Sequence, residues 1–286
     1  MSHALKPVES LSEAWLAALD YTIGSGNGRT PHLMMTVTQP GRETSCIRRG
    51  IDNELKFRNK QCVDTVAETI FPQPLYRDPG IDWCPDLSLE HLHKIDQAAR
   101  DLYSDYLMML PVLRTDKANR MGTYFSRMIS WPGKETEGIN QLDRVISRIR
   151  KSRHQAKNTE NTLDIDLSAD CLNDGVEAVL DGAQLVASDD KRVRGFPCLV
   201  HLDFSLLDGE LHCAAVYRHH HLLTKAYGNL VGLSNLMQFM CQQSGIKMGE
   251  LVVLDGLADG QPSSRSRRLA KRLRDELNGA TLGLEL

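Results

Sequence analysis

The sequence contains no apolar run long enough to cross a bilayer, and its first residues, MSHALKPVES, lack the apolar core of a signal peptide. It also contains no CxxC pair. Its 7 cysteines are scattered and odd in number, which is typical of reduced thiols rather than of a disulfide framework or a structural zinc site. We therefore expect a cytoplasmic protein without a membrane partner.

The sequence also has no excess of basic residues. It contains 34 basic and 37 acidic residues, which gives a formal net charge of −3. This balance argues against a nucleic-acid polymer as partner. The one basic cluster has the spacing of a solvated helix face, with Leu269, Leu273 and Leu277 on the opposite face. The cluster consists of Arg265, Arg267, Arg268, Lys271, Arg272 and Arg274.

No internal repeat, low-complexity tract or long linker divides the 286 residues, so we expect a single domain over residues 1–286. Ser10 or Ser12 can cap a first helix through Tyr21, and the glycine-rich residues 24–28 stop it. Apolar residues at helical spacing predict further helices. These cover residues 62–71, 89–109 (ending before Pro111), 139–149 and 229–243.

The strands are expected later in the chain. Apolar and polar residues alternate over residues 163–167, 200–206 and 211–217, and an apolar run covers residues 251–254. Asp208-Gly209 is a strong signal for a two-residue hairpin turn. Helices mixed with hairpin-paired strands favour an α+β sheet protein over a doubly wound fold.

One segment, residues 196–240, carries the main motif. It combines Pro197-Cys198, a turn glycine, Arg218 placed 20 residues after the cysteine and Asn229 placed 31 residues after it. This segment resembles the thymidylate synthase family, which has a Pro-Cys at the head of a strand, a glycine-turned hairpin, a motif arginine and an asparagine in the following strand-to-helix turn. Gly249–Asp259 (GELVVLDGLAD) continues the likeness.

Two weaker segments support the resemblance. Tyr124, Arg127 and Trp131 resemble the family's aromatic–arginine stretch, and VAETIFPQPLY from Val66 resembles the helix that carries the family's catalytic glutamate, which places Glu68 there. The likeness covers about half of the chain, and the first sixty residues match poorly. It implies a thymidylate synthase-like fold, a mixed β-sheet with helices packed on one side, in a homodimer.

The resemblance also implies a reaction: transfer of a one-carbon unit, methyl or hydroxymethyl, to carbon 5 of a uracil nucleotide, with 5,10-methylenetetrahydrofolate as donor. Cys198 takes the place of the nucleophile, because a thiolate is nucleophilic and a nearby arginine lowers its pKa. Arg218 suits that task and a forked contact to phosphate. Asn229 offers a donor and an acceptor to the uracil edge. Glu68 and Tyr124 take the other catalytic positions, Glu68 as a proton relay.

Several binding positions depart from the family pattern. Leu199 replaces the histidine after the nucleophile, and His221 replaces an aspartate that contacts folate. The nucleotide-binding positions are predicted at Arg218, Asn229, Asp203, His219, Asp259 and Gln261. Among these, Asp203 replaces a glutamine, His219 a phosphate-binding serine, and Asp259 and Gln261 the pair that binds the sugar hydroxyl. Arg153 or Lys157 partly substitutes for the paired arginines that reach across the dimer. These changes favour a specialised pyrimidine methylase or hydroxymethylase.

Each of the main predicted site residues also has a purely structural explanation. Cys198 alone fits a buried small hydrophobe, Arg218 a salt-bridge partner at a strand end, Asn229 a helix N-cap after Gly228, and Glu68 an exposed helix residue. Two other functions stay open. One is the same cysteine addition used in a reaction without folate, and the other is a family member that binds a nucleotide but has lost catalysis.

The run His219-His220-His221 admits a metal interpretation. On a strand, His219 and His221 share a face and bind zinc if a third ligand is near. No partner at metal-ligand spacing stands out in the sequence, and Arg218 would repel a cation. The sequence therefore predicts no metal site.

Overall fold

The computed structural model describes residues 3–25, 27–131, 137–154, 163–166 and 197–282. The chain forms two compact units. Unit 1 comprises residues 1–68, 216–234 and 249–286, and unit 2 comprises residues 69–215 and 235–248. β5 (Glu210–Tyr217), α7 (Tyr227–Ser244) and β7 (Lys247–Asp259) contribute residues to both. The single domain over residues 1–286 stays a prediction. Leu167, Cys171, Lys157 and the closing Leu-Glu-Leu lie outside the described residues.

The strands of unit 1 pair in both directions. β2 (Arg29–Val37) is antiparallel to β7, with Arg29 opposite Asp259 and Val37 opposite Leu251. β1 (His3–Ala4) lies parallel to β2, and β6 (His220–His221) lies parallel to β7 with His221 opposite Asp259. The sheet is therefore mixed, and the α+β class is confirmed. β7 extends well beyond the predicted apolar run because its pairing with β2 continues through the polar residues up to Asp259.

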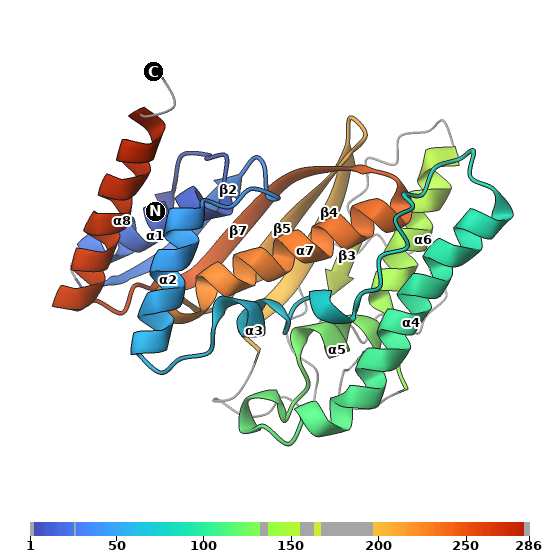
Figure 1. The fold of residues 1–286 in the computed structure, drawn as a ribbon, viewed down its shortest axis with the longest axis horizontal. Helices are drawn as coiled ribbons and strands as arrows, with labels where there is room; N and C mark the ends of the chain where they lie inside the picture. Colours follow the sequence, from blue (N-terminus) through green and yellow to red (C-terminus); the bar gives the residue numbers. More distant parts are fainter. Residues whose placement is uncertain (1–2, 26, 132–136, 155–162, 167–196, 283–286) are drawn as a thin grey trace. The chain divides into compact units, whose positions relative to one another are not determined.

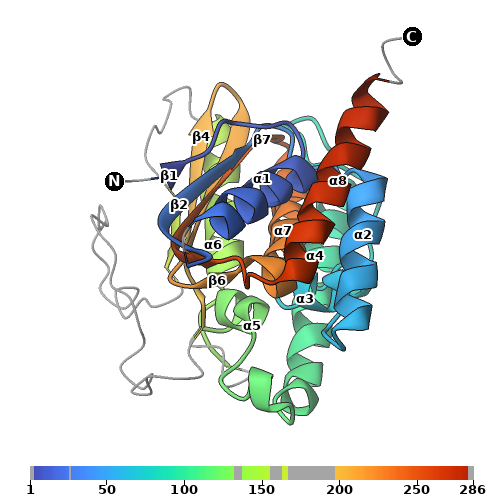
Figure 2. The ribbon, with the colours of Figure 1, turned by 90° about the vertical axis from the view of Figure 1, so that its left-hand side faces the viewer.

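The helices of unit 1 are α1 (Leu11–Gly24), α2 (Ser45–Phe57), α3 (Val63–Ala67) and α8 (Ser264–Leu282). Ser10 caps the N-terminus of α1 and forms a capping box with Glu13. Of the two caps that the sequence offered, Ser10 and Ser12, the structure has Ser10. Figure 2 shows α8 between α1 and α2. Leu269 and Leu273 of α8 are buried while most of its basic cluster is exposed, so the predicted solvated face is confirmed.

Unit 2 contains the predicted hairpin. β4 (Leu199–Leu207) and β5 are neighbours joined at Asp208 and Gly209, whose φ angles of 52° and 80° are those of a tight hairpin turn. β3 (Leu163–Asp166) pairs antiparallel with β4. In β5 every second residue is buried, as the alternation predicts.

The helices of unit 2 are α4 (Leu89–Leu113), α5 (Tyr124–Ile129) and α6 (Gln141–His154), with short 3₁₀ turns at Gln73–Leu75 and Lys117–Asn119. An ion pair of 2.7 Å between Arg150 and Asp96 joins α6 to α4, and Figure 1 shows the three helices. The core is aromatic: Phe71 packs against Phe125 and Phe239 with ring centroids 5.7 and 5.1 Å apart.

Two helix predictions were wrong at their ends. α4 continues past Pro111 to Leu113, because Pro111 lies exposed in the last turn, where losing one backbone hydrogen bond matters little. The helix predicted over residues 62–71 ends at Ala67, since a 3₁₀ turn after Pro72 takes over the local hydrogen bonds. Among the described residues, no helix is both long and apolar enough to span a membrane.

Candidate active site

In unit 2, Cys198 and Tyr124 lie together. Cys198 is half-buried directly before β4, and Tyr124 is the first residue of α5. The Tyr124 hydroxyl oxygen accepts the backbone N–H of Cys198 at 3.2 Å and that of Leu199 at 3.3 Å. Burial, with the Cys198 thiol as a second cause, raises the pKa of Tyr124 to about 12. The neutral phenol therefore fixes the backbone at the predicted nucleophile.

Asp203 and Cys213 also belong to unit 2. Asp203 on β4 is half-buried, and its Oδ1 accepts a hydrogen bond from Ser205 Oγ at 3.2 Å. Burial raises the pKa of the Cys213 thiol, and the Asp203 charge adds to the effect. Cys213 is thus held as an uncharged thiol, which is a poor nucleophile.

In unit 1, Asn229 belongs to a buried network with His220 and Asp255. Its amide Nδ2 donates to His220 Nε2 at 2.9 Å, so the ring proton sits on Nδ1, which donates to Asp255 Oδ1 at 2.8 Å. The three residues are 5%, 1% and 0% exposed. The His220 ring also stacks on Tyr217, 4.0 Å between centroids and 2° between planes.

The helix N-cap interpretation of Asn229 was wrong. A π-helical turn over Leu222–Ala226 runs directly into α7, which begins at Tyr227, so Asn229 already lies inside the helix. The tertiary contact with His220, nine residues earlier, decides its orientation. Its side chain is held in place but has little exposed surface.

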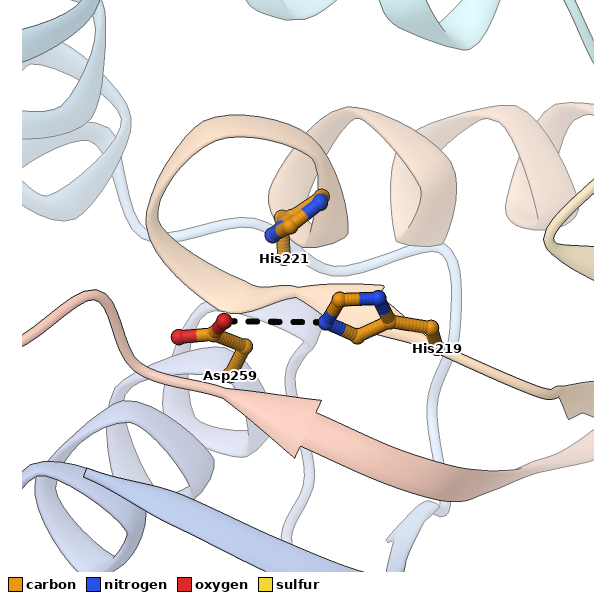
Figure 3. Close-up of side chains that lie close together, drawn as sticks. All are labelled: His219, His221 and Asp259. Atoms are coloured by element: carbon orange, nitrogen blue, oxygen red, sulfur yellow. Dashed lines mark ion pairs between the residues drawn. The ribbon is translucent and has the colours of Figure 1, made fainter. Parts of the chain in front are cut away.

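His219 and His221 lie on the other face of the same segment and meet Asp259, the last residue of β7 (Figure 3). One ligand atom from each lies within 4.8 Å of the others. His219 Nε2 is 3.6 Å from Asp259 Oδ2. Burial, followed by the charge of His219, lowers the pKa of His221, so its ring is held neutral at neutral pH.

Asp259 is oriented by its neighbours. Its Oδ1 accepts the backbone N–H of Gln261 at 2.9 Å, and its Oδ2 lies 3.4 Å from Arg29 Nε. Gln261 has a positive φ of 48°, and its Oε1 accepts from Thr224 Oγ1 at 3.1 Å. Both predicted sugar-binding residues line a surface cavity of about 480 Å³. Its lining residues are Asn27, Arg29, Arg58, Asp259, Gln261, Pro262 and Ser263.

The remaining predicted positions are exposed. Arg218 follows β5, and Gly256 leaves room for its backbone, since a Cβ there would lie 3.0 Å from the Arg218 carbonyl oxygen. Glu68 follows α3, and partial burial together with the charge of Asp64 raises the pKa of Glu68. The side chain of Arg153, like Lys157, is outside the described part of the chain.

The site residues therefore form two groups. Unit 2 brings Cys198 to Tyr124, while unit 1 gathers His219, His221 and Asp259, with Gln261 beside them. Sequence reasoning missed His220, Asp255 and Arg29 as partners of these residues. For His220 a signal existed, because the strand alternation that puts His219 and His221 on one face turns His220 to the other. Asp255 and Arg29 gave no local signal.

No family model matches the sequence. Curated relatives do match, among them two proteins with the name "Putative thymidylate synthase". The protein of Methanosarcina barkeri is 24% identical over 132 residues, which is 46% of this chain and 49% of the relative. That of Methanothermobacter marburgensis is 23% identical over 143 residues, 49% of this chain and 51% of the relative. The chain thus spans about half the length of the curated relatives it matches.

Solved thymidylate synthases are similar over part of the chain. The T4 phage enzyme is 16% identical with a TM-score of 0.31, over 44% of this chain and 37% of its own. Thymidylate synthase A of Bacillus subtilis is 14% identical with a TM-score of 0.33, over 48% and 41%. Scores of this size do not define a shared fold. The curated relatives confirm the resemblance: about half of the chain is similar, at low identity, to proteins named putative thymidylate synthase.

Proposed function

We propose that the chain binds a uracil nucleotide and that Cys198 adds covalently to carbon 6 of the ring, so that carbon 5 can accept a one-carbon unit. Two hydrogen bonds from Cys198 and Leu199 to Tyr124 carry this proposal. They fix the backbone of a half-buried cysteine at the head of a strand, which is how a nucleophile is held in position. The name of the curated relatives, putative thymidylate synthase, supports the same chemistry.

The proposed step conserves atoms and electrons. The Cys198 thiolate forms a C–S bond to carbon 6, and the electron pair of the ring double bond moves through carbon 5 to the oxygen on carbon 4, giving an enolate. Carbon 5 would then bond to the one-carbon unit of the donor. A base would remove the proton from carbon 5, and the electron pair released would expel the carrier and leave an exocyclic methylene group. Addition of water to that carbon would give a hydroxymethyl group, and addition of a hydride from the reduced donor would give a methyl group; either addition restores the ring double bond and expels the Cys198 thiolate. Glu68 is the proposed base, because a carboxylate with a raised pKa is better matched to proton transfer near neutral pH.

The remaining roles follow residue chemistry. Arg218 holds the phosphate through its forked guanidinium, and Asn229 addresses the base edge. His219, Asp259 and Gln261 receive the sugar and phosphate at the cavity where Asp259 and Gln261 lie, and Asp203 completes the nucleotide contacts. The protein is proposed to act as a homodimer in nucleotide biosynthesis.

5,10-Methylenetetrahydrofolate is the one-carbon donor that the resemblance implies. The residue predicted to contact it, His221, does not fit this role well. Its ring lies in the cluster with His219 and Asp259, and its pKa is lowered. A neutral imidazole offers one acceptor and one donor, whereas the aspartate of the family pattern offers two acceptors and a negative charge. The addition of Cys198 to the ring needs no folate, and this misfit favours a second candidate, the same addition in a reaction without folate.

The test is the intact mass of the protein mixed with 5-fluoro-UMP or 5-fluoro-dUMP, with and without methylenetetrahydrofolate. We expect an adduct with the wild type and with Cys62→Ala, which removes an exposed thiol, and none with Cys198→Ala. An adduct that requires folate supports one-carbon transfer, and an adduct without it supports the second candidate. If calorimetry detects nucleotide but no adduct forms under any condition, the chain is a nucleotide-binding protein and the proposal is wrong.

A further inference from the structure

A cluster of two histidines and one aspartate in unit 1 points to a ligand that neither the sequence nor the relatives assign. Strand pairing builds it. His221 stands opposite Asp259 in the parallel pair of β6 and β7. His219 lies in the bend directly before β6, and its side chain reaches the same aspartate (Figure 3). From this geometry we propose that His219, His221 and Asp259 bind a divalent transition-metal ion, with zinc as the first probe.

One buried ring nitrogen of each histidine in the cluster lacks a hydrogen-bond partner among the described residues. Among the described residues, neither His219 Nε2 nor His221 Nδ1 forms a hydrogen bond, although both atoms are buried. A buried polar atom without a partner costs about 1–3 kcal/mol, and proteins generally satisfy such atoms. A metal ion accepts both lone pairs at once, which one hydrogen-bond donor cannot do.

The spacing is close to that of a metal site. Zinc bonds of about 2.0–2.1 Å in a tetrahedron place ligand atoms about 3.3 Å apart. His219 Nε2 and Asp259 Oδ2 are 3.6 Å apart, and no pair in the cluster exceeds 4.8 Å. Small rotations of the side chains close the difference. The His219 and His221 rings, with centroids 4.4 Å apart and planes at 53°, are not stacked and can both direct a nitrogen at one point.

The outer contacts hold the carboxylate in place. The Gln261 N–H binds Asp259 Oδ1, which leaves Oδ2 turned toward the histidines. Such hydrogen bonds to the non-coordinating atom orient metal ligands. Two imidazoles and one carboxylate suit zinc or another transition metal better than magnesium or calcium, which prefer oxygen ligands alone.

Positively charged side chains near the cluster would repel a metal ion, but Arg29, Lys225 and Arg218 are exposed to solvent. Arg29 Nε lies 3.4 Å from Asp259 Oδ2, but 56% of the Arg29 side chain is exposed and can turn into solvent. Lys225 and Arg218 are exposed as well, so water and salt weaken their repulsion. Three protein ligands leave coordination positions open, as in catalytic rather than structural zinc sites. Asp259 also lines the cavity beside Arg29 and Arg58, where an anionic group of a bound molecule can reach the metal.

The test uses the full chain without a histidine tag, stripped with a chelator and titrated with Zn²⁺ in competition with a chromophoric chelator. We expect one ion per chain. His221→Gln and Asp259→Asn each weaken binding by at least about 100-fold, more than the loss of an outer partner usually does. Asp259→Asn keeps an acceptor for the Gln261 N–H. His212→Gln, on β5 of unit 2, leaves binding unchanged. Circular dichroism establishes that every variant is folded.

Two further readouts separate this site from adventitious binding. Substitution with Co²⁺ should give the visible bands of a low-coordinate site in the wild type and in His212→Gln but not in His221→Gln. Arg29→Gln, which removes the competing cation, should tighten zinc by about threefold. Unchanged zinc affinity in folded His221→Gln and Asp259→Asn, an equal loss in His212→Gln, or weaker zinc in Arg29→Gln overturns the proposal. The fluoronucleotide adduct is measured separately, so either proposal can fail alone.

Discussion

The two faces of the short segment His219–His221 place the same residue type in opposite environments. On one face, His220 is 1% exposed and both of its ring nitrogens have partners, Asp255 and Asn229. On the other face, His219 and His221 meet Asp259, and one buried ring nitrogen of each histidine has no hydrogen-bond partner among the described residues. The first face is a structural contact in which both nitrogens of the His220 ring are bonded, although Asp255 Oδ2 is buried without a partner among the described residues. The second face has the chemistry of a binding site.

This difference shows how a histidine acts once its surroundings are fixed. His220 stacks on Tyr217 and positions Asn229, so it acts through other residues. His219 and His221 lie beside a carboxylate: His219 Nε2 is 3.6 Å from Asp259 Oδ2, and the other carboxylate oxygen already accepts the N–H of Gln261. Alternation along β6 separates His220 from His221, while His219 lies in the bend directly before the strand. Four measurements test the separation of the two roles.

The largest effect is expected from His220→Ala. This change leaves Asp255 buried without its partner, and removing one member of a buried pair costs about 3–5 kcal/mol. The free energy of unfolding, measured by urea denaturation, should fall by that amount. His221→Ala, on the open face, should change it by less than about 1 kcal/mol. Equal losses in the two variants would remove the distinction between the faces.

Metal binding should stabilise the open face alone. At a free zinc concentration about 100-fold above its Kd, the folded state gains about 2.7 kcal/mol. The thermal midpoint of the wild type should rise on adding zinc and return after a chelator. His221→Gln should show no rise, whereas His212→Gln should behave as the wild type. A zinc-dependent rise in His221→Gln would place the ion elsewhere.

Asn229→Ala should have a smaller effect on stability. It removes one buried hydrogen bond to His220 Nε2 and leaves that nitrogen unsatisfied, at a cost of about 1–2 kcal/mol in the free energy of unfolding. If Asn229 also forms hydrogen bonds to the edge of the uracil ring, the variant should bind UMP or dUMP more weakly than the wild type. Calorimetry measures this at a temperature where the variant is folded. Unchanged nucleotide affinity would restrict Asn229 to its structural contact.

The smallest effect is a pH dependence from His221. Burial lowers the pKa of His221 below its ordinary value of 6.5, so the folded chain binds a proton less readily than the unfolded chain. Stability is therefore full above about pH 6.5 and declines as the pH falls through the window below it. The wild type without metal should lose a small part of its stability there. His221→Gln should flatten that part of the profile, and an unchanged profile would assign the titration to another group.

Much of the fold could be predicted from local patterns. The capping box at Ser10, the Asp208-Gly209 turn and the alternation in β5 depend on neighbours within a few residues, and each was confirmed. Predictions failed where distant residues decide. β2 was missed because Pro31 and His32, which has a positive φ of 51°, interrupt its pattern. Only its pairing with β7 makes it a strand.

In the candidate site, too, local sequence predicted some features and distant contacts decided the others. The sequence by itself predicted which residues could carry chemistry: Cys198, Arg218 and Asn229 from their spacing, and His219 and His221 from strand alternation. Only the tertiary structure decided their partners, because Tyr124 lies 74 residues from Cys198 and Asp255 lies 35 residues from His220. Asp259 reaches the histidines solely through the pairing of β6 with β7. A hydrogen bond or a metal ligand set needs atoms within a few ångströms, and chain folding alone brings such distant residues together.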